Sequence, residues 1–404
     1  MNSTFFSEYD KKMMRLAMKL AGKARGMTSP NPLVGAVIVK DGKTLSSGYH
    51  RMAGGPHAEI EAMDTFPDRT ALKNALLYVT LEPCSFYGKT PPCTDAIIKY
   101  GFSEVIIGSM DPNPEVSGSG IQKLKNAGIK VRYGLLEEKI AQQNEFFFKH
   151  IVSGSPFVTL KVASSIDGKI AVKSGDSKWI TGIQSRRLVH KIRKDYDCIL
   201  TGINTVINDD PYLYPRGKNG INPDIDKCKK YYRVILDSNL RTSTDSIIAR
   251  TSGKIKTMIF TWDQSNPDRK KVSALKSMDI DIIKVHGEQI RKIPGKSSKS
   301  QAAKKDQGSI RLDISSILKK LYDDYGITSI MIESGPTLAT EFLRKGLIDK
   351  FLFFISPSII GGDSDYSMFS ELDIRDVDSS ISLDIKSKKT IGTDILITAY
   401  PEII

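Results

Sequence analysis

The chain has 404 residues, 40% of them hydrophobic and 26% charged, with a formal net charge of +13. No stretch approaches the roughly 18 apolar residues of a membrane-spanning helix, and four cysteines in so long a chain do not make a disulfide framework. We therefore expect a cytoplasmic protein of two or three domains, with no membrane partner and with anionic ligands. Part of the positive charge is local, in the polar run 291–308.

The amino-terminal part predicts helices and strands in alternation. A helix over about 7–24 carries both apolar and acidic residues, which argues against a targeting segment. A hairpin over 33–48 follows, with its turn at Asp41-Gly42. Alternation of this kind is typical of a layered α/β sheet. Further helices are expected at 57–64, 93–100, 121–127 and 137–151, and further strands at 75–80, 104–108 and 130–133.

A second α/β pattern begins after Ser153-Gly154-Ser155-Pro156, where glycine and proline indicate a linker. No internal repeat relates the two halves. We therefore predict two unrelated domains, at residues 1–152 and 156–404. In the second, strands are expected at 157–163, 198–201, 233–237, 257–261, 327–333, 350–355 and 391–399, and a helix at 338–345.

Four residues of the amino-terminal half form a pattern with the chemistry of a metal site. His57, Cys84 and Cys93 each fall where a strand gives way to a helix, and helix amides there favour the metal-binding thiolate. Three protein ligands leave a tetrahedral zinc ion one open position, as catalytic zinc requires. Glu59 could take a proton from water activated there and pass it to a ring nitrogen and then to a leaving amine. His-x-Glu followed by Pro-Cys is the pattern of zinc nucleobase deaminases, and it predicts hydrolytic deamination.

The spacing of the cysteines narrows this class. Eight residues, SFYGKTPP, separate Cys84 from Cys93, whereas the usual deaminase pattern has two. Together with TLEPCS at 80–85, PNPLVG at 30–35 and DPNP at 111–114, this cassette resembles the bifunctional riboflavin-biosynthesis deaminase-reductases over nearly the whole chain. The resemblance implies a cytidine-deaminase-like α/β/α domain followed by a dihydrofolate-reductase-like α/β domain, in a homo-oligomer.

The same resemblance implies a substrate for the first domain, 2,5-diamino-6-(5-phosphoribosylamino)pyrimidin-4-one. Asn31 and His50 match positions that would hold the pyrimidine ring, and Lys89 would meet the phosphate as a point charge. At Phe86 the family usually carries histidine. One polar contact to the substrate is therefore absent or comes from elsewhere.

In the second half, the segments 161–169, 177–181 and 190–211 resemble the reductase part of the family. No Rossmann glycine motif follows a strand here. Instead, the run from Glu333 to Thr337 joins an apolar strand to a helix whose first amides can bind pyrophosphate; the family more often has glycine at Ser334. The resemblance implies NADPH contacts at Ala163, Trp179, Thr205, Asp209, Ser238, Gly335, Pro336, Thr337, Leu338, Ala339, Thr340 and Glu341.

The reaction implied for the second domain is reduction of the ribosyl side chain by NADPH, giving 5-amino-6-(5-phosphoribitylamino)uracil. The resemblance places substrate contacts at Ser177, Arg193, Leu213, Arg216 and Glu333, and the fork of a guanidinium suits Arg193 and Arg216 to bidentate phosphate binding. The sequence does not identify the proton donor. Lys161 and Glu333 are the candidates, each also a candidate binding charge.

Two other functions fit part of the pattern. A zinc deaminase acting on tRNA or another nucleic acid would explain the net charge through phosphate contacts. The long cysteine cassette, the lack of aromatic residues within the basic run and the reductase-like second half weigh against it. A non-enzymatic zinc scaffold would need a fourth protein ligand, and no further histidine or cysteine was expected near the cluster; Cys198 and Cys228 carry no ligand spacing. We therefore predict a small phosphorylated pyrimidine as the partner, and no nucleic acid.

Overall fold

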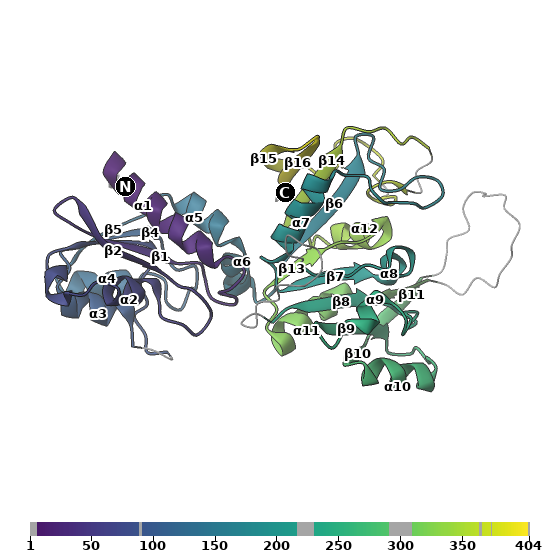
Figure 1. Ribbon diagram of the computed structural model, residues 1–404, viewed down its shortest axis with the longest axis horizontal. Coiled ribbons are helices and arrows are strands. Elements are labelled where there is room, and N and C mark those ends of the chain that lie inside the picture. The colour runs from purple at the N-terminus through teal and green to yellow at the C-terminus, as the bar shows by residue number, and fades with distance from the viewer. Residues whose placement is uncertain are drawn as a thin grey trace, which may run out of the picture. The chain divides into compact units, whose positions relative to one another are not determined.

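A computed structural model describes residues 6–88, 91–215, 230–290, 309–362, 366–372 and 374–402. The chain divides into two compact units, the first ending at Ser155 and the second beginning at Pro156 (Figure 1). Two predicted site residues, Lys89 and Arg216, lie outside the described residues, as do Cys228 and the basic run 291–308. No helix within the described ranges has both the length and the apolar character that crossing a membrane requires.

The first unit is built on a five-stranded sheet with the order β2-β1-β3-β4-β5. Strand β1 is antiparallel to β2 and β3, whereas β3, β4 and β5 are parallel. The strands are β1 (Gly35–Lys40), β2 (Lys43–Tyr49), β3 (Leu76–Leu81), β4 (Glu104–Ser109) and β5 (Lys130–Tyr133). The helices are α1 (Glu8–Ala21), η1 (Gly22–Ala24), α2 (Ala58–Asp64), η2 (Arg69–Leu72), α3 (Cys93–Tyr100), α4 (Ser119–Asn126), α5 (Glu137–Gln143) and α6 (Glu145–Ser153).

Both faces of this sheet are covered, because successive side chains of a strand point to opposite sides. Leu77 and Val79 of β3 pack in one cluster with residues of α2, α3 and α4, including Ile97. Tyr78, between them, packs in another cluster with residues of α1 and α5, including Met14. The unit is therefore an α/β/α sandwich, as expected for a cytidine-deaminase-like domain.

The predicted helix over 137–151 is wrong in one respect, since it is two helices that break at Asn144. The buried Asn144 side chain accepts a hydrogen bond from the Leu33 amide at 2.7 Å and donates one to the Leu33 carbonyl at 3.0 Å. The Asn144 side chain thus satisfies both backbone groups of Leu33, as a neighbouring strand would, and holds the adjoining segment Asn31-Pro32 in place. The contact joins residues far apart in sequence, so helical periodicity could not predict it.

The second unit contains a nine-stranded sheet with the order β10-β9-β8-β7-β13-β6-β14-β16-β15. Neighbours are parallel from β10 through β14, and β16 and β15 extend the sheet in antiparallel fashion. A separate ribbon pairs β11 with β12. The strands are β6 (Phe157–Ser165), β7 (Cys198–Gly202), β8 (Tyr232–Leu236), β9 (Lys256–Trp262), β10 (Ile280–Val285), β11 (Gly287–Ile290), β12 (Ser309–Leu312), β13 (Ser329–Ile332), β14 (Lys350–Ser356), β15 (Leu383–Ile391) and β16 (Asp394–Pro401).

Helices flank this sheet, and only the last of them was predicted. The predicted strand over 391–399 is also corrected: β15 ends at Ile391, and Gly392, with a φ of 66°, turns the chain into β16. Side chains from β6, β7, β8, β9 and β13 form the main core with α11 and α12. The helices are α7 (Ile183–Arg193), α8 (Ile203–Asp209), α9 (Ile247–Arg250), α10 (Arg269–Ser277), α11 (Ile314–Tyr325) and α12 (Pro336–Arg344).

Candidate functional site

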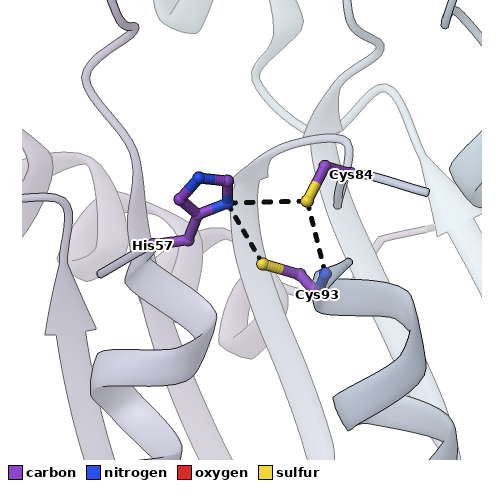
Figure 2. A group of neighbouring side chains, drawn as sticks. All are labelled: His57, Cys84 and Cys93. Atoms are coloured by element: carbon purple, nitrogen blue, oxygen red, sulfur yellow. Dashed lines mark hydrogen bonds between the residues drawn. The ribbon is translucent and has the colours of Figure 1, made fainter. Parts of the chain in front are cut away.

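Three side chains of the first unit, His57, Cys84 and Cys93, converge beyond the end of β3 (Figure 2). His57 Nδ1 lies 3.5 Å from Cys84 Sγ and 3.2 Å from Cys93 Sγ. All three potential ligand atoms lie within 4.8 Å of one another. One imidazole and two thiols form a donor set that suits zinc and leaves its fourth position open.

Local structure explains this convergence. His57 is the residue that precedes α2 and has extended backbone, with a φ of −69°, while Cys93 is the first residue of α3. The free amide of Cys93 donates to Cys84 Sγ at 3.3 Å, and the Thr94 amide donates to the Cys84 carbonyl at 3.2 Å. Amides at a helix start favour a negative sulfur. The largest cause that lowers the pKa of Cys84 to about 4 is the side-chain hydrogen bond with the Cys93 thiol; His57 and the Cys93 amide lower it further.

Glu59 lies in the first turn of α2 and is only 3% exposed. Burial, followed by the negative charge at Cys84, raises the pKa of Glu59 to about 7. The charge of His57 and the contact with Cys93 lower this pKa, but by less than burial and Cys84 raise it. The structure thus places a buried carboxyl group, which can change protonation state, directly beside the candidate metal ligands.

Asn31 and His50 lie beside this cluster. The His50 ring stands edge-on to that of His57, with 5.8 Å between centroids. Its Nδ1 donates to the Pro56 carbonyl at 2.9 Å, and its Nε2 accepts from the Asn31 amide at 3.1 Å. A histidine therefore lies close to the cluster, contrary to the expectation of no further histidine there, although His50 was already expected to hold the pyrimidine ring. Because both of its nitrogens are engaged, His50 is not free to be a fourth ligand.

Phe86, the position where the family usually has histidine, is 53% exposed. The described neighbours of Phe86 include Gly88, whose added Cβ would meet the phenyl ring at 3.8 Å. The structure therefore leaves this side chain at the surface of the Cys84–Cys93 loop.

In the second unit, a cavity of about 1500 Å³ opens along the carboxyl ends of the parallel strands. Ligands of open α/β sheets bind at such edges. Nearly all the predicted reductase residues that the structure describes line it: Ala163, Trp179, Thr205, Asp209, Ser238, Gly335, Pro336, Thr337, Leu338 and Glu341 from the cofactor set, and Lys161, Ser177, Arg193, Leu213 and Glu333 from the substrate set.

An ionic cluster forms one wall of this cavity. Strand β13 pairs with β6 so that Ile332 faces Leu160, and the next residues, Glu333 and Lys161, therefore lie side by side. Lys161 Nζ is 3.6 Å from Glu333 Oε2. Arg193, at the end of α7, donates to both Glu333 oxygens, at 2.5 and 2.9 Å.

Charge within the cluster fixes the protonation of its members. Burial alone would raise the pKa of Glu333, but Arg193 and Lys161 outweigh it and lower that pKa to about 2. Burial is the main cause that lowers the pKa of Lys161. Glu333 is therefore a permanent anion near neutral pH, and Lys161 is an ammonium group that gives up its proton more readily than an exposed lysine.

The start of α12 faces the cavity. Gly335 is the residue before the helix and Pro336 is its first residue; a Cβ at Gly335 would meet nothing within 4 Å. The first amides of a helix have no partner within it, so this open helix start fits a pyrophosphate group. Ala339 and Thr340 differ from their neighbours. Both side chains are buried away from the cavity, and the Thr340 hydroxyl accepts a hydrogen bond from the Ser370 amide at 2.8 Å.

Further contacts organise the rest of the cavity wall. Ser177 donates to Asp209 at 3.1 Å, which links two predicted contact residues. Trp179 is 71% exposed, and the Arg186 guanidinium lies over its ring at 4.3 Å from the centroid. The exposed indole face thus belongs to the cavity and not to the core.

Several polar residues at the cavity were missed by the sequence analysis. Arg241 donates to Asn204 at 2.6 Å, and Arg311 lies 3.1 Å from Glu341. Only the position of Arg241, three residues after Ser238, was a signal that sequence reading could have used. The buried Arg233 donates to the Tyr212 carbonyl at 3.1 Å and so supports the segment that carries Leu213. Nothing in its sequence context indicated that role.

The fold and these two sites define a bifunctional enzyme, a zinc-dependent deaminase joined to a reductase. Family models agree: the cytidine and deoxycytidylate deaminase zinc-binding region matches residues 7–109, and the RibD C-terminal domain matches residues 156–397. The riboflavin biosynthesis protein RibD of Aquifex aeolicus (strain VF5) is 38% identical over 96% of this chain and 98% of its own.

Solved structures give the same result. Acinetobacter baumannii RibD, form 1, is 34% identical with a TM-score of 0.81. A diaminohydroxyphosphoribosylaminopyrimidine deaminase/5-amino-6-(5-phosphoribosylamino)uracil reductase from Thermotoga maritima is 34% identical with a TM-score of 0.78. Each match covers 98% of this chain and 99% of the solved one. The chain therefore belongs to the RibD family of riboflavin biosynthesis proteins. Its two-domain fold and its use of Zn²⁺ and NADPH are as the sequence predicted.

Proposed function

We propose that the protein catalyses two consecutive steps on one phosphorylated pyrimidine. Residues 1–152 deaminate 2,5-diamino-6-(5-phosphoribosylamino)pyrimidin-4-one, and residues 156–404 reduce the product to 5-amino-6-(5-phosphoribitylamino)uracil. The name of the Thermotoga maritima relative supports this substrate pair. One observation carries the proposal: the same chain contains both sites. The first unit has the His-Cys-Cys cluster beside the buried Glu59, and the second has a cavity lined by charged side chains.

In the deamination step, His57, Cys84 and Cys93 would hold zinc, which would supply Lewis-acid activation of the attacking water. Glu59 takes a proton from that water and delivers it to the ring nitrogen. The oxygen of that water bonds to the ring carbon, its second proton passes by way of Glu59 to the amino group, and the bond from carbon to this group breaks, so that ammonia leaves and a carbonyl remains. Asn31 positions the ring, since its amide is held against His50. Lys89 meets the substrate phosphate.

In the reduction step, bound NADPH would supply a hydride to the sugar carbon that is attached to nitrogen, and the bond from this carbon to the ring oxygen of the sugar would break. The α12 start holds the cofactor pyrophosphate, and the exposed face of Trp179 lines the same cavity. Arg216 would hold the substrate phosphate; Arg193 lines the same cavity, but its guanidinium fork already donates to both oxygens of Glu333. Glu333 stays ionised beside Arg193 and so cannot give a proton, which leaves the Lys161 ammonium as the donor to the sugar oxygen.

We also propose that the protein is a cytoplasmic homo-oligomer, as the resemblance to the family implies, and that its partner is this small substrate. A nucleic-acid substrate is not favoured, because the family matches cover both halves of the chain and the second half has a reductase cavity.

Two signals measured separately test the proposal. Purified protein is mixed with zinc, the pyrimidine phosphate and NADPH, and ammonia release and loss of nicotinamide absorbance are followed. We expect ammonia without NADPH present, and NADPH oxidation only after deamination or with supplied deaminated substrate. Ammonia release that is never followed by NADPH oxidation would reject the bifunctional assignment. Binding to RNA in a gel shift, without turnover of the small substrate, would favour the nucleic-acid deaminase instead.

A further inference from the structure

Glu82 is a buried carboxylate that the proposed chemistry does not use. It lies two residues before Cys84 and is 6% exposed. Each of its oxygens accepts two backbone N–H groups: Oε2 accepts from Asp111 at 3.2 Å and Gly118 at 2.9 Å, and Oε1 accepts from Gly120 at 2.9 Å and Ile121 at 3.1 Å. A buried carboxylate needs such partners, and four of them make Glu82 the organising group of the segment that enters α4.

The same segment, 118–121, contacts the chain on both sides of Cys84. Before Cys84, a Cβ at Gly120 would lie 2.1 Å from the Pro83 carbonyl oxygen, so only glycine allows this approach. After Cys84, the hydroxyl groups of Ser85 and Ser119 lie 2.7 Å apart. Residues 82, 83 and 85 are thus all fixed against one short segment. Cys84 has little freedom to move relative to it.

We propose that Glu82 is a positioning residue for zinc, which holds Cys84 at the place where its sulfur meets His57 and Cys93. It acts through the backbone and touches neither metal nor substrate. The inference rests on the proposed zinc role of Cys84. The proposal predicts that zinc affinity depends on a carboxylate that lies two residues before the nearest metal ligand, Cys84. The Cys84 sulfur in turn contacts the other two ligands, through the Cys93 amide and the His57 ring.

The Glu82→Gln variant tests this with almost no change in shape. The amide side chain has one accepting oxygen instead of two, so two of the four N–H groups lose their partner and face an NH₂ group. We expect zinc affinity to fall about 10- to 100-fold, as for other groups that orient metal ligands. The readouts are competition with a chromophoric zinc chelator and the visible spectrum of the Co²⁺-substituted protein. Glu82→Asp, which keeps both accepting oxygens, should recover part of the affinity.

Glu115→Gln is the matched control, because it makes the same charge change at an exposed position of the same connection. It should bind zinc like the parent protein. Gly120→Ala perturbs the Pro83 contact from the opposite side without altering charge, and it should weaken zinc binding as Glu82→Gln does. NADPH oxidation with supplied deaminated substrate reports the second unit, and it should be unchanged in all these variants.

Parent-like zinc affinity and Co²⁺ spectra in both Glu82→Gln and Gly120→Ala would overturn the inference. If both variants fail to fold, Ser119→Ala decides, since it removes the exposed contact to Ser85 and a hydrogen bond to the Val116 carbonyl but leaves the four amides on Glu82 in place. A few-fold loss of zinc affinity supports the inference, and no loss overturns it. Failure of the proposed function looks different. In that case the parent protein itself would bind zinc in a way that does not change when Cys84 is replaced by serine.

Discussion

Two glutamates, the buried Glu59 and the largely buried Glu333, lie at the two sites in opposite electrostatic surroundings. Glu59 lies beside sulfur ligands, and the charge of His57 offsets its burial only in part, so that its pKa rises to about 7. Glu333 is held by Arg193 and Lys161, which outweigh its burial and lower its pKa to about 2. Burial therefore does not by itself decide what a carboxyl group does. The charges around it make one glutamate a proton carrier and the other a fixed anion.

The largest effect should come from removing the proton carrier. Glu59→Gln keeps the shape of the side chain but cannot take up a proton, and general acid–base catalysis contributes about 10²- to 10⁴-fold. We expect ammonia release to fall by that factor, while NADPH oxidation with supplied deaminated substrate continues. Deamination at the parent rate in Glu59→Gln would remove this residue from the mechanism. Equal loss of both activities would indicate a folding defect instead.

Removing the fixed anion, Glu333, should lower the free energy of unfolding of the second unit. Glu333→Gln leaves Arg193 and Lys161 buried without a counter-charge, and breaking a buried pair costs about 3–5 kcal/mol. Denaturant unfolding of the second unit measures this. As the control, Asp324→Asn breaks the exposed pair with Lys320 in the same unit and should cost less than about 0.5 kcal/mol. Similar losses in the two variants would contradict the strong coupling inferred for Glu333.

The pH dependence of stability should follow from the same shift. The pKa of Glu333 falls from about 4.3 in an unfolded chain to about 2 in the folded protein. This difference adds on the order of 3 kcal/mol to the free energy of unfolding. Because the folded pKa is the lower one, this stability is fully present above about pH 5 and is lost as the pH falls toward 2. Between about pH 5 and pH 2, the free energy of unfolding should therefore fall less steeply with pH in Glu333→Gln than in the parent protein. The same slope in both proteins would refute the lowered pKa of Glu333.

The smallest expected effect comes from a substitution on the face of α12 that lies away from the cavity. Thr340→Val removes the acceptor for the Ser370 amide and should cost about 1 kcal/mol of unfolding free energy. The affinity for NADPH, measured by fluorescence titration, should not change, because the Thr340 side chain does not line the cavity. A large loss of NADPH affinity with unchanged stability would restore the prediction that Thr340 contacts the cofactor.

The two sites also differ in how far sequence could predict them. His57 and Cys93, 36 positions apart, sit at helix starts that the motifs and hydrophobic patterns identify. Arg193 and Glu333 are 140 positions apart and meet only because β13 lies between β6 and β7. Their roles came from family resemblance, since neither has a local pattern that indicates an ion pair.

The break in the predicted helix 137–151 and the inward orientation of two residues predicted to contact NADPH have the same origin. Asn144 interrupts a helix because it pairs with Leu33, and Ala339 and Thr340 turn inward because α12 packs on the core. Both outcomes depend on partners that are distant in the chain. Helical periodicity within a short window contains no information about them.

By itself, the sequence determined the class of chemistry: two thiols, one imidazole and one nearby carboxylate in this spacing are a zinc deaminase motif, because metal preference and helix-start electrostatics are local properties. The tertiary structure decided how the groups are held and charged. It engaged both nitrogens of His50, brought Lys161 and Arg193 to Glu333, and fixed Cys84 through the four amides on Glu82. These outcomes required strand order and packing, since each joins atoms that only the folded chain brings within hydrogen-bonding distance.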